Sequence, residues 1–502
     1  MKKLFKFPTA LSIILVIIML TTMPTFAGEI KNAPTKIKKI KKSSKQTTKA
    51  STKGKKAKKS KKQGCGKTPL KKEVEEKQPV RNVNFKVNPE ETCVPLKLNL
   101  DKCVKLALES HPDIKIARAK VDYARGQYNE TKSSYNMKFD LQGGYMRMDP
   151  VSKVNVGKTT IKLGDENNFS GKAILEKVIT TFGNLENLIA ASALNILSAE
   201  ENYLKTRQDV LFTVKKNYFN VLRTAGRTRI TRENLDIVRQ QLKITNDMYD
   251  AGIVPLFEIV QNKLYLSRSR QALTSAEKSH KIAISALLES LKLDINLPVK
   301  LNKKYDYRPI KVDLKKAQEL AHKNRYEIKS LDISLKAAQK ILLSAQCGRN
   351  PTLSFQSTIE NKTISGLSTE PTTVTSMLVL SIPLSDGGES YAKIEQAKAS
   401  IKELKETLDK TTRLIELEVK NVVLTIWELE SKLDAARQDL ETARIGYNIA
   451  LARYENGIST SLELNNARRL LNETRINYNN VAYEYLIELA NLEKVTANTW
   501  KE

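Results

Sequence analysis

The phrase MYDAGIVPLFEIVQNK occupies residues 248–263, and a second version of it, RYENGISTSLELNNAR, occupies residues 453–468. The two phrases align without gaps and keep an aromatic residue, a glycine and an acid in the same order. A phrase that recurs in this way indicates that one structural unit occurs twice in the chain. The aligned pairs are Tyr249/Tyr454, Gly252/Gly457, Ile253/Ile458 and Glu258/Glu463.

Each phrase ends a long run without proline that favours helix. The runs follow the glycine-marked turns TFGN and SDGG, and their only internal glycines are Gly226 and Gly446. At 1.5 Å per residue, roughly 65 residues predict a helix about 100 Å long. Apolar residues recur every seven positions in the first run, which is typical of a coiled-coil seam and requires partner helices. The seam residues are Leu204, Leu211, Tyr218 and Ala225, with Val214 and Val221.

The repeated phrase itself predicts a sharp turn. Gly252 and Gly457 end the long helices, in the position where a left-handed glycine cap is favoured. The following stretches, about 257–295 and 461–497, are again helical in pattern and are expected to run back antiparallel. Each phrase is therefore interpreted as the tip of a helical hairpin, formed twice in the chain.

The repeat also extends upstream of the long helices. LDKCVKLALESHPDI from Leu100 aligns with LKKAQELAHKNRYEI from Leu314, and helical stretches are predicted at 101–135 and 315–347. Pro112 suits the first turn of a restarted helix, because its missing N–H would have no intrahelical partner there. His111 is therefore expected to be a cap residue rather than a metal ligand.

Between the shorter and longer helices lie segments in which apolar and polar residues alternate. They are expected to form two hairpins, at about 138–181 and 351–384. The alternation predicts strands with one apolar face, and it is typical of membrane barrels, although a soluble sheet packed on a helix gives the same pattern. The connection DPVSKVNVGKTTIKLGDE is longer than NKTISGLSTEP and explains about ten extra residues in the first half. The apolar positions include Phe139, Leu141, Tyr145, Phe169, Leu175, Phe355, Ile359, Leu378 and Leu380.

The N-terminus carries export and charge signals. MKKLFKF, an apolar run and Ala27 predict a Sec signal peptide over residues 1–27, because a membrane anchor requires about 20 apolar residues. Residues 31–72 hold 18 Lys and no acid, which is more than half of the formal charge of +30. This Lys-rich tail, with its linker at 28–97, is expected to be disordered. It is interpreted either as a segment that binds an anionic cell-wall polymer or lipid headgroup, or as a solvated leader.

The composition argues against a metal site, a cofactor or a catalytic function. Only three histidines and four cysteines occur, widely scattered and without a CxxC motif, so neither a metal site nor a cofactor is expected. A disulfide between Cys93 and Cys103 is left open. No G-x-S-x-G or P-loop motif is present, and the protein is not expected to be an enzyme.

Together these features resemble the TolC-like family of bacterial outer-membrane efflux proteins. The resemblance covers about residues 98–500 and depends on the LDKCVKLALESHPDI stretch, the turns at Gly183 and Gly387, and the two tips. It implies a mainly α-helical chain with a membrane β part. Four strands per chain would close a twelve-stranded barrel in a homotrimer, above a long α-helical coiled-coil tunnel in the periplasm. The first repeat would span 98–298, an equatorial linker 299–313, and the second repeat 314–502.

The resemblance further implies an outer-membrane exit duct of a tripartite efflux or type I secretion system. Such a duct conducts substrates passively and depends on a periplasmic adaptor (membrane fusion) protein and on an inner-membrane transporter of the RND, ABC or MFS type. The alternative weighed against it is an inner-membrane-anchored periplasmic coiled-coil or adaptor protein. The duplicated hairpin and the amphipathic strands favour the duct.

Residues at the tips are assigned by the same resemblance. Acidic residues after the tip glycine would line the pore entrance, and a ring of carboxylates favours cations, although both acids are also consistent with ordinary exposed helix positions. Exposed apolar tip residues are expected to contact the adaptor. The entrance residues are Glu258, Gln261, Glu463 and Asn466, with Tyr249 and Tyr454 expected to hydrogen-bond across hairpins; the adaptor-contact residues are Gly252, Ile253, Val254, Gly457, Ile458 and Ser459.

Overall fold

A computed structural model describes residues 96–162, 165–301, 310–362 and 372–498. The expected signal peptide, the Lys-rich tail, Cys65 and Cys93 lie outside the described residues, so the expectations made for them stay predictions. The described chain is mainly helical, as expected, and its two halves repeat the same order of elements. None of the described helices combines the length and the apolar composition of a membrane span.

The first half follows the predicted order of short helices, strand hairpin, long helix and return helix. The long helix begins and ends within a residue of the predicted positions, whereas the return helix stops at Ser290 rather than about 295. Within the long connection between strands, a small extra hairpin forms that we had expected to be a loop. The elements are α2 (Leu100–Ser110), α3 (Pro112–Ser133), β2 (Lys138–Arg147), β3 (Lys153–Val156), β4 (Thr159–Lys162), β5 (Asn167–Thr180), α4 (Asn184–Asp250) and α5 (Leu256–Ser290).

The second half repeats this plan without the extra hairpin among its described residues. A parallel pair of three-residue strands, one on either side of the first half, also forms, and its first strand straddles the expected boundary between the linker and the first repeat. The elements are β1 (Leu96–Leu98), β6 (Val299–Leu301), α6 (Leu314–Asn324), α7 (Tyr326–Gln346), a short 3-10 turn η1 (Cys347–Arg349), β7 (Thr352–Lys362), β8 (Thr372–Ser381), α8 (Glu389–Glu455) and α9 (Ser461–Thr496).

His111 caps the restarted helix, as predicted. Its Nδ1 accepts a hydrogen bond from the Asp113 N–H at 3.2 Å, and Pro112 occupies the first turn of α3. Nearby, Cys103 is buried in the core, where burial raises the pKa of its thiol to about 11. The suggested bridge from Cys103 to Cys93 remains a hypothesis, because Cys93 is outside the described residues.

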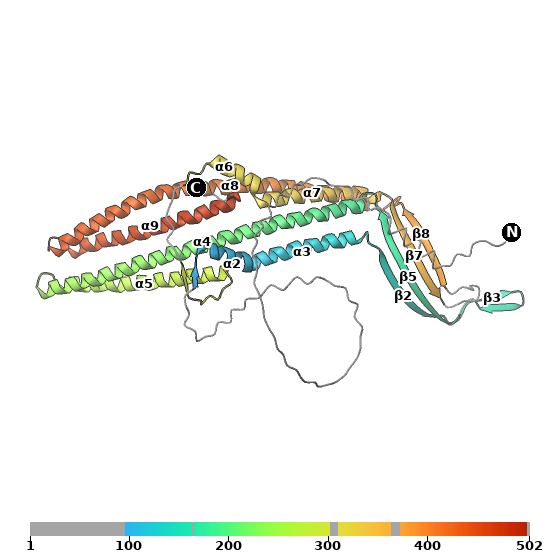
Figure 1. The fold of residues 1–502 in the computed structure, drawn as a ribbon, viewed down its shortest axis with the longest axis horizontal. Coiled ribbons are helices and arrows are strands. Elements are labelled where there is room, and N and C mark those ends of the chain that lie inside the picture. Colours follow the sequence, from blue (N-terminus) through green and yellow to red (C-terminus); the bar gives the residue numbers. More distant parts are fainter. Residues whose placement is uncertain (1–95, 163–164, 302–309, 363–371, 499–502) are drawn as a thin grey trace, which may run out of the picture. The chain divides into compact units, whose positions relative to one another are not determined.

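The four main strands form one antiparallel sheet in the order β2-β5-β7-β8 (Figure 1). The register places apolar residues of all four strands on one face, because Leu141 pairs with Ala173, Ala173 with Ile359, and Ile359 with Val374. Within the described chain, β2 and β8 each pair with a single neighbour. The sheet of one chain is therefore open at both edges.

The turn from the sheet into α4 is held by a carboxylate. Gly183 has a left-handed φ of 105°, and its N–H and the Thr181 hydroxyl both donate to Glu186, at 3.0 and 2.8 Å. Burial opposes ionisation of Glu186, but these bonds and one from Tyr135 outweigh it and lower the pKa to about 2. Glu186 thus retains its charge, and with it the capping interaction, at neutral and mildly acidic pH.

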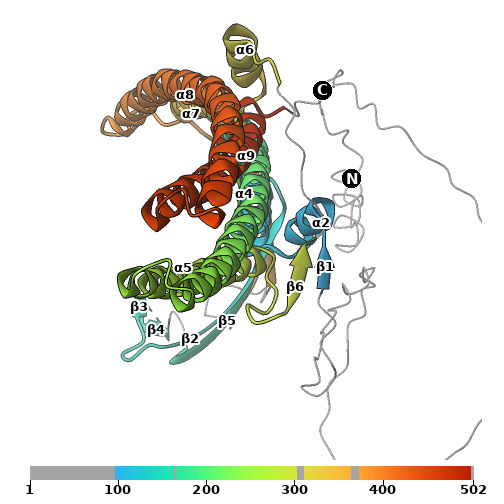
Figure 2. The same cartoon turned by 90° about the vertical axis from the view of Figure 1, so that its left-hand side faces the viewer.

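The long helices lie in a curved layer (Figures 1 and 2). Near the sheet the order of packed helices is α3-α4-α7-α8, and toward the tips it is α5-α4-α9-α8. Two apolar cores lie between these levels, one of which includes the predicted seam residues Val214, Tyr218 and Val221. The other is built on α8 and α9, with Ile426 and Leu492 fully buried.

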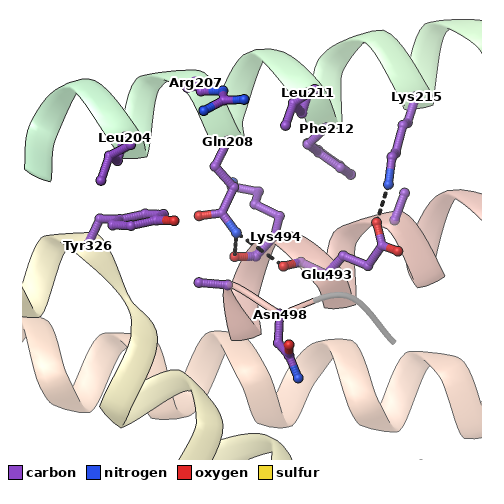
Figure 3. A pocket seen from close by; sticks show the side chains of 12 residues that line it. Leu204, Arg207, Gln208, Leu211, Phe212, Lys215, Tyr326, Glu493, Lys494 and Asn498 are labelled. Carbon is purple, nitrogen blue, oxygen red and sulfur yellow. Dashed lines mark hydrogen bonds and ion pairs between the residues drawn. The ribbon is translucent and has the colours of Figure 1, made fainter. Parts of the chain in front are cut away.

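The end of α9 docks against α4 at a cavity of about 220 Å³ (Figure 3). The Gln208 side chain donates to the carbonyls of Glu493 and Lys494, at 3.1 and 2.8 Å. Lys215 forms an ion pair with the Glu493 carboxylate (Figure 3). These contacts supply partners for carbonyls that a helix terminus leaves unpaired, so they position the two repeats relative to each other.

The two internal glycines of the long helices differ in their surroundings, which gives a testable contrast. A Cβ on Gly226 would lie 2.0 Å from Oδ1 of Asn479, whose amide donates to the Arg223 carbonyl, whereas Gly446 faces open space. We expect Gly226→Ala to lower the free energy of unfolding by about 1–3 kcal/mol through overpacking. Gly446→Ala should instead raise it by up to about 1 kcal/mol, the ordinary gain in helix propensity. Thermal unfolding followed by circular dichroism checks both, and equal shifts would contradict the close approach of α9.

Candidate functional site

The two tips have the same backbone geometry. In the first tip, the Ile253 N–H donates to the Met248 carbonyl at 2.9 Å and the Gly252 N–H donates to the Tyr249 carbonyl at 2.9 Å. Gly252 has a φ of 72°, where a side chain would be strained. The second tip repeats these bonds, with Gly457 at a φ of 71°. The predicted left-handed glycine cap is therefore confirmed at both tips.

Apolar side chains are exposed beyond these turns. Ile253 is 65% exposed and Ile458 69%, while Val254 and Ser459 are half-buried. The first tip also exposes neighbouring apolar residues that we had not assigned, and their signal was the apolar run after Pro255. Exposed apolar groups clustered at the end of a long hairpin favour contact with another protein. The additional residues are Leu256 and Phe257 in the first tip and Leu462 in the second.

The two predicted entrance acids have different environments. Glu463 lies in the first turn of α9, where its N–H donates to the Thr460 hydroxyl, and its carboxylate lies 3.4 Å from Arg453. The Ser459 hydroxyl donates to the same carboxylate at 2.6 Å. Thr460 therefore caps the helix, and the charge of the Glu463 carboxylate is balanced locally by Arg453.

Glu258, in contrast, faces the contact between the hairpins. Its Oε2 is buried without a hydrogen-bond partner. Burial raises the pKa of the Tyr454 hydroxyl, and the Glu258 carboxylate raises it further. Of the remaining entrance residues, Gln261 is half-buried on the same helix and Asn466 is exposed. The structure thus brings Glu258 close to Tyr454, but it does not gather all six predicted entrance residues in one place within a chain.

The two predicted tyrosines are not equivalent. Tyr454 is only 2% exposed, and its hydroxyl lies 3.1 Å from that of Thr245 on the other hairpin. Asn262 donates to the same Thr245 hydroxyl at 2.9 Å. Tyr249 occupies the corresponding position in the first tip but is 40% exposed. Tyr454 therefore bridges the two hairpins of the chain, whereas Tyr249 lies at the surface.

A chain with duplicated helical hairpins and an amphipathic sheet open at both edges has the architecture of a channel subunit. The family model described as outer membrane efflux protein matches residues 103–291 and 318–498, and the chain belongs to this family. It is accordingly an outer-membrane protein of the TolC-like efflux type.

Individual relatives are distant. The chain is 20% identical over 431 residues to the probable outer membrane lipoprotein SilC of Salmonella typhimurium, covering 84% of this chain and 88% of that protein. It is 20% identical over 385 residues to the pyoverdine export outer membrane protein OpmQ of Pseudomonas aeruginosa, covering 74% and 79%. Among solved structures, the CmeC outer membrane channel of Campylobacter jejuni matches with a TM-score of 0.70 at 19% identity, covering 80% and 86%. The structural match supports the fold alone.

Proposed function

We propose that the protein is the outer-membrane exit duct of a tripartite efflux or type I secretion system. The observation that carries this proposal is that every layer of the chain ends in two different open edges. The sheet ends in β2 and β8, the helical layer near the sheet in α3 and α8, and the layer near the tips in α5 and α8. A head-to-tail contact between unlike edges generates a closed ring when its rotation closes.

Closure is also required by the membrane. Unpaired strand edges are not tolerated in lipid, because their N–H and C=O groups would have no partners. Three copies, joined β8 to β2, would pair every strand in a twelve-stranded barrel, with the apolar face toward lipid. The same contact would close the helices into a periplasmic tunnel.

The exposed tips would then meet a periplasmic adaptor, which connects the tunnel to an inner-membrane transporter of the RND, ABC or MFS type. The duct itself would conduct passively and use no cofactor, because the transporter supplies the energy. One relative, OpmQ, is a pyoverdine export protein. From this relative we infer only the class of activity for the present chain, which is efflux across the outer membrane.

The proposal is tested by the mass and outline of the protein extracted from the outer-membrane fraction in mild detergent. Light scattering should give three chains per particle, and negative-stain images should show a rod. A monomer or dimer recovered from the inner membrane would overturn the duct and favour the alternative, an anchored periplasmic coiled-coil or adaptor protein.

Tyr454→Phe should open the entrance of this duct. The change removes the hydroxyl that bridges the hairpins, which contributes about 1 kcal/mol per chain. If three chains open together, openings in planar-bilayer recordings should become about a hundredfold more frequent. Tyr249→Phe is the matched control, because the exposed Tyr249 should leave the recordings unchanged. Equal behaviour of the two variants would argue against a gating role for the bridge.

A further inference from the structure

A second polar contact joins the hairpins farther from the tips than Tyr454. Arg468 on α9 donates through Nη1 to Oε1 of Gln241 on α4, at 3.2 Å. The two residues are only 6% and 5% exposed. No sequence pattern marks either residue, because an arginine on a long, charged helix is ordinarily solvated. The contact is therefore a buried guanidinium between two separate hairpins.

The guanidinium has aromatic and amide neighbours, but the described part of the chain provides it with no counter-ion. It lies 5.4 Å from the centre of the Tyr265 ring on α5, and it interacts electrostatically with Tyr447 on α8. Burial lowers the pKa of Arg468 from its ordinary value. No carboxylate of the described residues lies within ion-pair distance of it. Because all four helices of the tip region surround this group, separating the hairpins would necessarily change its environment.

Unsatisfied polar atoms occur in this contact and elsewhere near the tips. Nε2 of Gln241, Oδ1 of Asn465 and Oε2 of Glu258 are buried without hydrogen-bond partners. A buried polar group without a partner is costly, and a buried charge without a counter-ion is more so. Water entering between separated hairpins would hydrate these groups.

Near the tips, the apolar cluster that could offset the cost of these buried polar groups is small. Among the described residues, the apolar cluster nearest the tips has three buried members, Ala450, Tyr454 and Leu464, with partly buried side chains packed against them. The two cores between the tips and the sheet are larger and are built mainly from apolar side chains. The hairpins are thus firmly joined near the middle of the chain's long helices and weakly joined near their tips.

We propose that the buried Arg468–Gln241 contact keeps the entrance able to open, because it makes the joined arrangement of the hairpins only marginally favourable. Arg468 is a positioning residue in this role, and the free energy of hydrating it opposes tight closure. The inference rests on the proposed function, because it concerns the opening of the same duct. It predicts that removing the polar character of the contact closes the duct more tightly, which is the opposite of the effect expected for Tyr454→Phe.

Two variants of the full-length protein test this. Gln241→Leu combined with Arg468→Met replaces both polar side chains by apolar ones of similar size, and such replacements of buried polar pairs are often stabilising. Gln241→Glu keeps the shape and supplies the missing carboxylate. The matched control is Glu233→Leu combined with Arg475→Met, which removes an inter-hairpin ion pair that is partly exposed and already charge-balanced.

Planar-bilayer recordings and thermal unfolding of the purified protein are the readouts. Both test variants should give about tenfold fewer openings than the wild type and a higher melting temperature, and both should suppress the openings caused by Tyr454→Phe. The control pair should not reduce openings. Unchanged or more frequent openings in both test variants, with Tyr454→Phe still active, would overturn the inference alone. A wild-type protein and a Tyr454→Phe variant that never conduct would instead overturn the proposed function and the inference with it.

Discussion

Arg325→Met is expected to lower the free energy of unfolding by about 3 kcal/mol per chain. The side chain of Arg325 is 7% exposed and lies between α6 and α7. Its Nη2 contacts the Glu418 carboxylate at 2.8 Å, and its Nε lies 3.1 Å from that of Glu327 as an ion pair rather than a hydrogen bond. Removing the cation leaves two carboxylates without their main partner. Because three helices, α6, α7 and α8, meet at this arginine, the loss should affect the whole chain.

This loss is at the lower end of the range for breaking a buried ion pair, because two other cations lie near the carboxylates that Arg325 would leave unpaired. Lys205 lies 3.6 Å from Glu327, and Lys494 lies 3.9 Å from Glu418. Arg413→Met is the matched control, since Arg413 is exposed and its pair with Asp409 is worth no more than about 0.5 kcal/mol. Thermal unfolding of both variants measures the difference. A loss for Arg325→Met as small as that of the control would mean that water screens the whole cluster.

Local patterns in the sequence were sufficient for the long elements of the fold. The ends of α4 and α8 were predictable because glycine-marked turns bound runs without proline, and Gly252 and Gly457 confirmed the caps. The pair of β1 and β6 was missed because each strand has three residues and its partner lies about two hundred positions away. Such a short strand shows too few alternations for a period to be recognised.

At the candidate site, alignment of the two repeats predicted which residues lie near the tips but not which of them are buried. Tyr249 and Tyr454 align, as do Lys263 and Arg468, each pair at a constant distance from its tip glycine. In the structure the second member of each pair is buried and the first is exposed. The difference arises because α4 packs on α9, which no local pattern specifies. Aligned residues in the two repeats therefore acquire different environments from tertiary packing.

Leu378→Arg is expected to prevent assembly in the outer membrane. Leu378 is exposed near the middle of β8 and pairs with Phe355, on the apolar face that the proposed barrel turns toward lipid. A cationic side chain on the lipid face near the bilayer midplane costs about 2–4 kcal/mol. Each chain of the proposed trimer would carry the change, so the total should exceed what a marginally stable assembly tolerates. The measured quantity is the amount of folded protein in the outer-membrane fraction.

The neighbouring residue provides the control for this prediction. Met377 pairs with Gln356, which pairs with Glu176, so it lies on the opposite, polar face of the sheet. Met377→Arg introduces the same charge one position away in the same strand, where it would face a water-filled lumen. It should assemble at close to the wild-type level and alter ion selectivity. If both variants lose the same amount of folded protein from the outer-membrane fraction, neither face of the sheet is buried in lipid. The two faces are both exposed in the single chain, so only a surrounding membrane would make the sheet respond differently to a charge on one face than on the other.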